Sequence, residues 1–286
     1  FVGLDVMVLY IYREPNRPLP ETARLIHIDS DPRQLGKNYA ADVAILGNLR
    51  TTLSELGQAW RARATEDERA CAARRRQNWE AQLLEVRGQL REQAARAFES
   101  GKLEPLAVME AVRRVLPDEG VLVLEATSVQ GTYLEQGGWL KNPALYFGHR
   151  GWALGWGAGF AIGVKLAWPE RPVLAILGDG AALYGVQALW TTAHYRIPVV
   201  WLVANNREYT ILKTCANVMG LRDILACSDT LEIRNPEIDF VRLAQGFGVE
   251  ALRPANVREL EEMLTWAWSS DQPVLLDVAL SAVWDR

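Results

Sequence analysis

The sequence predicts an α/β protein whose main domain is a doubly wound parallel sheet with helices on both faces. Short continuous apolar runs recur along the chain and are bounded by Pro, Asp and Gly, as expected of buried parallel strands. In the second half of the chain, these runs alternate with segments that have the apolar spacing of helices. Alternating strands and helices fold into a parallel sheet that is covered on both faces.

Three parts follow one another along the 286 residues. Residues 1–60 read as strand, loop, strand, helix, strand, helix, which would leave open sheet edges and therefore indicates half of a doubly wound domain. Residues 61–103 are rich in Arg, Glu, Gln and Ala with a narrow apolar stripe, so we expect a helical linker. Residues 104–286 form a third part that is long enough to bury its own core.

The apolar runs assign individual elements. In the first part, strands are expected over residues 6–11, 24–29 and 42–47. In the last part, strands are expected over 121–125, 173–177, 199–203 and 274–278, with helices over 183–195 and 258–268. Doubly wound sheets bind their ligands at the carboxyl ends of the strands, so site residues are sought there.

Composition excludes several classes of function. A formal net charge of −4 provides no basic surface for nucleic acid or a membrane. Three widely spaced cysteines (Cys71, Cys215 and Cys227) match neither a disulfide framework nor a zinc pattern, which favours a reduced, cytoplasmic setting. No apolar run reaches the ~18 residues of a membrane span, and no signal peptide begins the sequence. Because the chain starts at Phe1 rather than Met, we expect it to be part of a longer protein.

The most informative motifs follow two successive strands. Gly178-Asp179-Gly180 lies between a strand and a helix, and Asn205-Asn206 follows the next strand, with 24 residues between Gly180 and Asn205. This interval fits one helix, a turn and one strand, which places Asp179 and Asn206 at the same end of the sheet. Their hard oxygen atoms suit Mg²⁺ bound with a phosphate group, whose charge a helix N-terminus stabilises. Each motif alone is an ordinary turn or cap, but together they predict a site.

These motifs resemble the cofactor signature of the thiamine diphosphate-dependent 2-oxo acid decarboxylases and synthases. The context of residues 188–198 fits the same family, and the match through Tyr209 and Leu212 is closest to benzoylformate decarboxylase. By contrast, residues 26–38 resemble the middle domain of acetolactate synthase. The resemblance covers nearly the whole chain and implies the thiamine diphosphate-binding fold, preceded by a partial Rossmann-like middle domain.

The resemblance also implies roles for individual residues. Asp179, the side-chain oxygen of Asn206 and the backbone carbonyl of Glu208 would bind Mg²⁺, and Leu154 would be the apolar wedge under the bent cofactor. The full cofactor-binding set is Thr127, Ser128, Trp152, Leu154, Gly178, Asp179, Gly180, Ala181, Asn206, Glu208, Tyr209 and Thr210. Leu212 and Cys215 match substrate-pocket positions, and His149 is the candidate for a catalytic contact. Ala181 departs from the family, which often has Ser there.

The implied function is non-oxidative decarboxylation or carboligation of a small-molecule 2-oxo acid, as a lyase or transferase, by a homodimer or homotetramer. FAD is not favoured, because Leu9–Pro20 departs from the acetolactate synthase pattern. Family members also use a glutamate on an N-terminal pyrimidine-binding domain that nothing here resembles. Glu125 lies on the wrong element for that task and is interpreted as structural. The chain alone is therefore expected to be inactive.

Two alternatives belong to other classes. The chain could be a non-catalytic, thiamine diphosphate-binding regulatory or assembly subunit, which the presence or absence of an upstream domain with a suitable glutamate would decide. It could also be a nucleotide-binding oxidoreductase. That class requires a Gly-x-Gly-x-x-Gly turn, and the run from Gly155 to Gly159 does not supply one because residue 160 is Phe.

Overall fold

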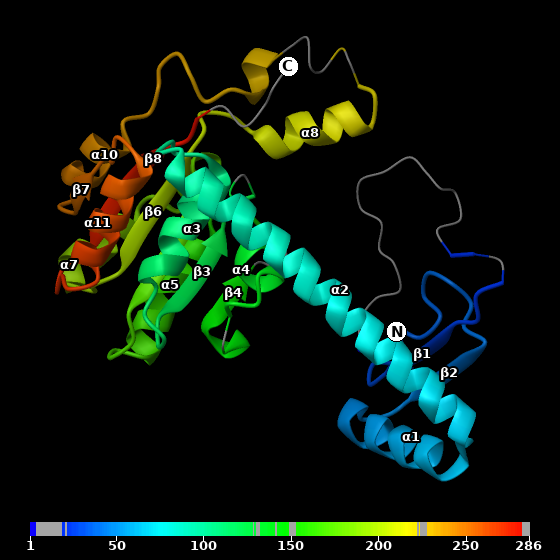
Figure 1. Ribbon diagram of the computed structural model, residues 1–286. Helices are drawn as coiled ribbons and strands as arrows, with labels where there is room; N and C mark the ends of the chain where they lie inside the picture. Colours follow the sequence, from blue (N-terminus) through cyan, green and yellow to red (C-terminus); the bar gives the residue numbers. More distant parts are fainter. Residues whose placement is uncertain are drawn as a thin grey trace. The chain divides into compact units, whose positions relative to one another are not determined.

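The computed structural model describes residues 1–3, 19–20, 22–127, 129, 132–140, 142–148, 153–221, 223 and 228–281. These residues form two compact units (Figure 1). One consists of Phe1–Gln82 with Cys215–Arg222, and the other of Leu83–Thr214 with Asp223–Arg286. The second unit carries the motifs that the sequence singled out.

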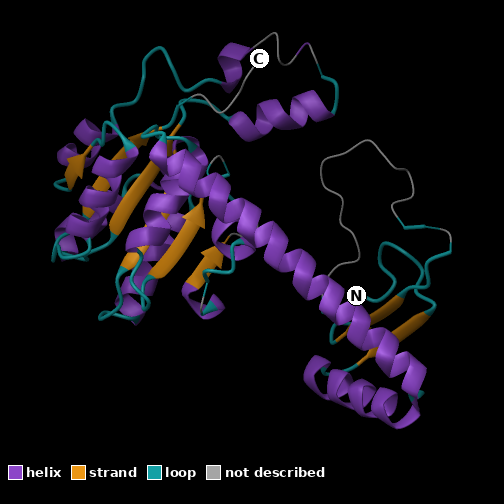
Figure 2. Cartoon of the chain, in the orientation of Figure 1, coloured by secondary structure: helices purple, strands orange, loops and turns teal. Residues whose placement is uncertain are grey.

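The second unit is built on one parallel sheet in the order β4-β3-β5-β6-β8-β7 (Figure 2). Its strands are β3 (Val121–Glu125), β4 (Tyr146–Gly148), β5 (Val173–Gly178), β6 (Val200–Asn205), β7 (Glu250–Leu252) and β8 (Val274–Ala279). The four strands expected in this part are confirmed. The short edge strands β4 and β7 carry too few apolar residues for the sequence pattern to reveal them.

Helices cover both faces of this sheet, which confirms the doubly wound architecture (Figure 2). They are α3 (Pro105–Val115), α4 (Thr132–Gln136), α5 (Trp156–Ala167), α6 (Asp179–Gly185), α7 (Ala188–Tyr195), α10 (Phe240–Gly246) and α11 (Val257–Ala267). A further helix, α8 (Thr210–Val218), follows β6 and contributes no residue to either core. Two 3₁₀ turns, η1 (Pro143–Leu145) and η2 (Ser228–Leu231), complete the set of described elements. The single helix expected over residues 183–195 is wrong, because α6 begins at Asp179 and ends before Val186.

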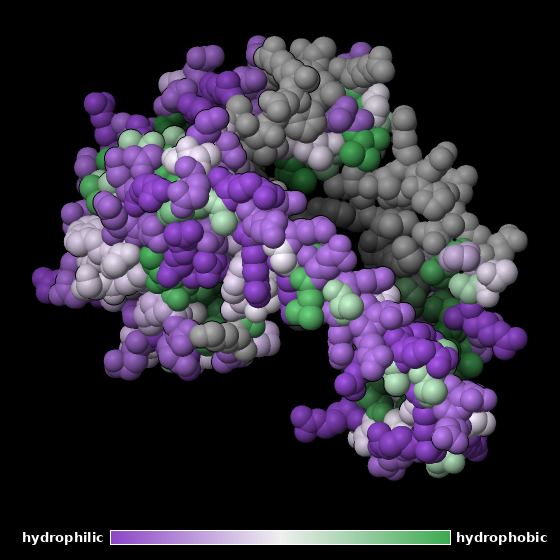
Figure 3. All heavy atoms as spheres, viewed as in Figure 1, coloured by the Kyte–Doolittle hydropathy of each residue, from purple (hydrophilic) through white to green (hydrophobic). Residues whose placement is uncertain are grey.

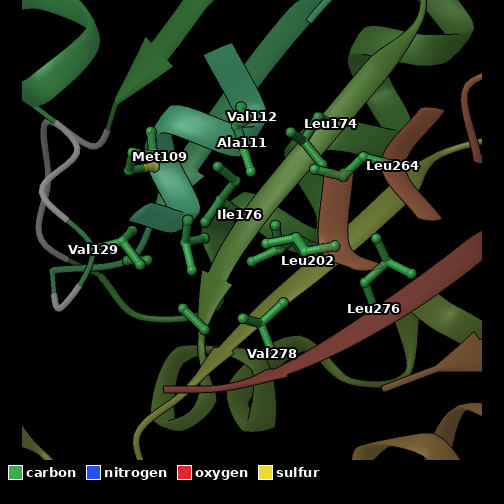
Figure 4. Packing of buried hydrophobic residues seen from close by; sticks show 14 of the residues in the cluster. Met109, Ala111, Val112, Val129, Leu174, Ile176, Leu202, Leu264, Leu276 and Val278 are labelled. Atoms are coloured by element: carbon green, nitrogen blue, oxygen red, sulfur yellow. The ribbon is translucent and has the colours of Figure 1, made fainter. Parts of the chain in front are cut away.

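Alternate residues of each central strand pack into two different cores. On β5, Leu174 and Ile176 face the core beneath α3 and α11, where Val112 and Leu264 meet them (Figure 4). Val173, Ala175 and Leu177 of the same strand face the opposite core with α5, α7 and α10. A strand that is buried on both faces reads as a continuous apolar run, which is why the sequence revealed it.

A buried carboxylate ties α3 to α4. The carboxylate of Glu110, whose side chain is 5% exposed, accepts hydrogen bonds from Arg113 at 2.6 and 2.7 Å and from Arg114 at 2.9 Å. The buried Tyr133 hydroxyl of α4 donates to the same carboxylate at 2.6 Å. Arg113 also lies over the Trp139 ring. The charge of Glu110 is thus compensated inside the fold.

The first unit contains the parallel pair β1 (Ile26–Asp29) and β2 (Val43–Leu46), followed by α1 (Leu49–Arg63). The expected strand at residues 6–11 lies outside the described residues. The helix expected between the two strands is wrong: residues 30–41 form turns, in which Asp29 accepts from the Asp31 N–H at 2.8 Å. Aspartate side chains that bond to nearby backbone N–H groups favour such turns over a helix.

Residues Glu66–Glu99 form the long helix α2, as expected for this polar stretch. Thr65 and Glu68 bond reciprocally at its start, with the Thr65 N–H donating to Glu68 at 2.8 Å, and this pattern caps helix N-termini. The face seen in Figure 3 is mostly hydrophilic with scattered apolar residues. Among the described residues, no helix is both long and apolar enough to cross a membrane. That α2 acts as a linker stays a prediction.

Candidate functional site

Three neighbouring strands end at one edge of the sheet in the second unit. Glu125 at the end of β3 pairs in register with Leu177 of β5, and Gly178 of β5 pairs with Ala204 of β6. The residues that follow these ends are Thr127, Asp179 and Asn206. Parallel pairing therefore brings three of the predicted cofactor-binding positions to the same edge, although the first and the last are more than 70 residues apart in sequence.

Asp179 is the buried carboxylate of this edge. Its side chain is held by backbone N–H groups: Gly180 donates to Oδ1 at 2.7 Å and Arg207 to Oδ2 at 2.5 Å. The residue is only 3% exposed, and burial raises the pKa of Asp179 to about 6 against the effect of these hydrogen bonds. No lysine or arginine among the described residues pairs with it. A buried carboxylate without a cationic partner is a suitable ligand for a metal ion.

The glycine after Asp179 leaves room for a neighbouring ring. A Cβ at Gly180 would lie 2.5 Å from Cε1 of Tyr209, a clash that any larger residue would have to relieve. Tyr209 follows β6, so this close approach packs the turn after β5 against the turn after β6. Gly178 has no such neighbour within 3.8 Å and Ala181 is buried in α6. The motif glycine at 180 thus has a packing role in addition to any contact with a ligand.

Asn206 is oriented by its neighbours on the same turn. Its Nδ2 donates to the Thr210 hydroxyl at 2.6 Å, and its Oδ1 accepts from the Glu208 N–H at 3.2 Å. The Thr210 hydroxyl in turn donates to the Glu208 carboxylate at 2.8 Å. That carboxylate forms an ion pair with the buried Lys213 of α8. The structure thus gives the side chain of Glu208 a role, whereas the sequence assigned only its backbone carbonyl.

The first asparagine of the pair bonds to β8. The Asn205 amide donates to Asp277 of β8 at 3.0 Å, and Arg253 donates to the other oxygen of Asp277 at 2.6 and 3.0 Å. Asp277 is fully buried. Asn205 therefore anchors the end of β6 to β8, in line with Asn206 being the predicted ligand. Sequence reasoning missed Lys213, Arg253 and Asp277, because isolated charged residues carry no spacing signal.

Glu125 secures the turn that carries the predicted wedge. Its two carboxylate oxygens accept from the Gly155 N–H at 2.6 Å and the Gly157 N–H at 2.7 Å. Burial raises the pKa of Glu125 in spite of these bonds. Gly155 has φ of 90°, which favours glycine. The adjacent Leu154 is 49% exposed, so its apolar side chain is free to contact a ligand.

Several predicted residues have no described environment. Ser128, His149 and Trp152 lie outside the described residues. Thr127 is exposed just after β3. Leu212 is 48% exposed on α8, whereas Cys215 falls in the segment Cys215–Arg222 of the first unit. The assignment of Leu212 and Cys215 to a substrate pocket stays a prediction.

The donors present fit Mg²⁺ rather than a softer metal. Asp179 offers a buried carboxylate and Asn206 an amide oxygen, the hard ligands that Mg²⁺ prefers, and it completes its shell with phosphate and water. In the described part of the chain, no group of three or more His, Cys, Asp and Glu side chains is placed to bind a metal. Asp179 and Asn206 together suit a metal ion that is bound with a diphosphate.

Comparison with known protein families identifies the chain. The model described as "Thiamine pyrophosphate enzyme, C-terminal TPP binding domain" matches residues 131–278. The chain belongs to the thiamine pyrophosphate enzyme family. The family's central-domain model matches residues 2–56. The predicted family and its cofactor, thiamine pyrophosphate (thiamine diphosphate), are thereby confirmed.

Curated relatives of this member of the thiamine pyrophosphate enzyme family include both kinds that the sequence suggested. It is 32% identical over 269 residues to benzoylformate decarboxylase of Pseudomonas aeruginosa, a match covering 94% of this chain and 46% of that protein. It is 30% identical over 261 residues to the acetolactate synthase large subunit of Parasynechococcus marenigrum, covering 90% and 39%. The chain thus spans less than half the length of these relatives.

Solved structures show that the fold is shared. The thiamine diphosphate-dependent 4-hydroxybenzoylformate decarboxylase of Rhodococcus jostii RHA1 superposes with a TM-score of 0.70 at 24% sequence identity. The match covers 98% of this chain and 48% of that structure. At this identity, the likeness establishes the fold of the thiamine pyrophosphate enzymes and leaves the substrate open.

Proposed function

We propose that this chain is the part of a Mg²⁺-dependent enzyme that binds the diphosphate of thiamine diphosphate, acting on a 2-oxo acid. The observation that carries the proposal is the meeting of Asp179 and Asn206 at the ends of the paired strands β5 and β6. Asp179, Asn206 and the Glu208 carbonyl would hold Mg²⁺, and Thr127 and Gly180 lie where the diphosphate would bind. The bound cofactor supplies a nucleophile for the substrate carbonyl and an electron sink for loss of CO₂.

The residues of this chain position the cofactor and compensate the charge of the metal ion. Asp179 compensates the charge of Mg²⁺, and backbone N–H groups fix its two oxygens in advance, so that binding needs little reorganisation. Glu125 fixes the turn of Leu154 through two backbone N–H groups, which supports the role of Leu154 as a wedge. Such pre-ordering is what a cofactor held in a strained, bent shape requires.

Calorimetric titration with thiamine diphosphate tests the proposal. We expect saturable binding in the presence of Mg²⁺ and at least tenfold weaker binding after chelation with EDTA, because the diphosphate binds largely through the cation. Thiamine, which lacks the diphosphate, is the control ligand and should bind weakly with or without Mg²⁺. Equal binding of thiamine diphosphate with and without Mg²⁺ would contradict the assigned metal ligands.

Turnover is proposed to need residues beyond this chain, which spans 46% of its Pseudomonas relative. With pyruvate or benzoylformate, the 286-residue chain is expected to release no CO₂ and form no acetolactate above a no-protein control. Assaying both substrates with both products, in the chain and in the longest available form of the protein, also separates decarboxylation from carboligation. Assembly as a homodimer or homotetramer, as the resemblance implies, is part of the proposal. Full activity of the chain alone would overturn this division of roles.

A further inference from the structure

A buried ion pair is linked by hydrogen bonds to the proposed metal ligand Asn206. The side chains of Glu208 and Lys213 are 7% and 9% exposed, and their charged ends are in contact. Lys213 also approaches the carboxylate of Glu232 at 3.4 Å. Burying such charges has a cost that their mutual attraction only partly offsets, so the pair contributes little net stability. Its position next to the metal turn points to another role.

The hydrogen-bond chain that starts at this pair has a defined direction. The Glu208 carboxylate accepts a hydrogen bond from Lys213 in this ion pair, and a carboxylate only accepts hydrogen bonds. The single hydroxyl proton of Thr210 must therefore point to Glu208, to which it donates at 2.8 Å. The Thr210 oxygen is left as an acceptor, so the Asn206 atom that lies 2.6 Å away has to be the donor, Nδ2.

This hydrogen-bond chain also fixes the orientation of Oδ1, the oxygen of the Asn206 amide. With Nδ2 committed to Thr210, the oxygen Oδ1 is turned to the opposite side, where the Glu208 N–H is its one protein donor among the described residues, at 3.2 Å. The second lone pair of Oδ1 is thereby available to a cation. An amide turned the other way would present two N–H donors to the metal and repel it.

We propose that Lys213 is a positioning residue that acts through Glu208 and Thr210 to present the oxygen of Asn206 to the cation. The inference rests on the proposed function, since it concerns the same site. Groups that orient metal ligands typically change the affinity for the metal about 10–100-fold when removed. We therefore expect Thr210→Val, which keeps the shape but loses the hydroxyl, to weaken Mg²⁺ binding by this factor.

Calorimetry with thiamine diphosphate at varied Mg²⁺, and electron paramagnetic resonance of Mn²⁺ as the metal alone, provide two readouts without turnover. Lys213→Met is expected to match Thr210→Val, and Thr210→Ser to stay within threefold of the unchanged chain because it keeps the hydroxyl. Lys165→Met is the matched control, since among the described residues Lys165 donates to the backbone carbonyls of Pro169 and Arg171, which precede β5 at its other end. Circular dichroism confirms folding of each variant.

Testing Thr210→Val in a second variant, Asn206→Asp, distinguishes an effect on the orientation of the Asn206 amide from an effect on the stability of the turn. Asn206→Asp presents an oxygen whichever way its side chain turns, so Thr210→Val should change metal affinity less than twofold in that background. An equal loss in both backgrounds, or unchanged affinity of Thr210→Val in the original one, would overturn the inference. Failure of the unchanged chain to bind thiamine diphosphate with Mg²⁺ would instead reject the proposed function.

Discussion

Replacing Asp179 by Asn is expected to abolish the Mg²⁺-dependent part of thiamine diphosphate binding, with a loss of more than about 100-fold. Asp179 is the one carboxylate proposed to bind the cation, and even groups that only orient a ligand change affinity about 10–100-fold. Asparagine keeps the size of the side chain and an oxygen that accepts the Gly180 N–H, but its Nδ2 replaces the oxygen that accepts the Arg207 N–H. The expected loss comes mainly from the removed charge and is measured by calorimetry at fixed Mg²⁺.

The same variant carries its own control for folding. The Asp179 carboxylate is buried without a cationic partner in the described part of the chain, so removing its charge relieves a desolvation cost. The amide nitrogen would face the Arg207 N–H, which offsets this gain, so we expect Asp179→Asn, without metal, to unfold at a urea concentration close to that of the unchanged chain. Lower binding with nearly unchanged stability is the signature of a ligand. Binding within threefold of the unchanged chain would exclude Asp179 from the metal site.

Replacing Glu110 by Gln should lower the free energy of unfolding by about 3 kcal/mol, because it removes one partner of a buried ion pair. Two arginines and the buried Tyr133 hydroxyl would then face a neutral amide. Urea unfolding followed by circular dichroism measures the loss. Glu119→Gln is the matched control: Glu119 also pairs with an arginine but is 70% exposed, so a change below about 1 kcal/mol is expected.

The contribution of Glu110 to the free energy of unfolding has a defined pH dependence. Burial raises the pKa of Glu110, but the hydrogen bonds from Arg113, Tyr133 and Arg114 outweigh it, so the pKa is lower than the ordinary value of 4.5. A lowered pKa gives stability that is fully present above 4.5 and is lost as the pH falls through the pKa in the folded protein. The difference between the unchanged chain and Glu110→Gln should therefore be constant at neutral pH and shrink below 4.5. A difference that grows on acidification would reject this assignment.

The sequence predicted the sheet well because its central strands are buried on both faces. The runs that became β3, β5, β6 and β8 are continuous apolar segments. The break between α6 and α7 was not predictable in the same way. Gly185 approaches the Gly155 carbonyl so closely that a Cβ would lie 2.9 Å from it, and this contact is between residues 30 apart in sequence.

The residues of the candidate site likewise fall into those that the sequence pattern could predict and those that it could not. Asp179 and Asn206 were predicted as ligands because each directly follows a strand, and sheet topology places such residues together. Lys213 and Asp277 were missed because their partners, Glu208 and Arg253, are defined by side-chain directions that apolar spacing does not encode. Glu125 was interpreted as structural, but its hydrogen bond from the Gly155 N–H could be seen only in the folded backbone.

The order β3-β5-β6 at the centre of the sheet makes cofactor binding a reporter of native structure. Asp179 and Asn206 converge only after β5 and β6 have paired, so an unfolded chain offers no equivalent site. Ligand that binds only the native state shifts the folding equilibrium by mass action, by about 2.7 kcal/mol at a concentration 100 times the dissociation constant. The melting temperature of the protein should therefore rise with the concentration of the metal–cofactor complex, and resistance to proteolysis should rise with it.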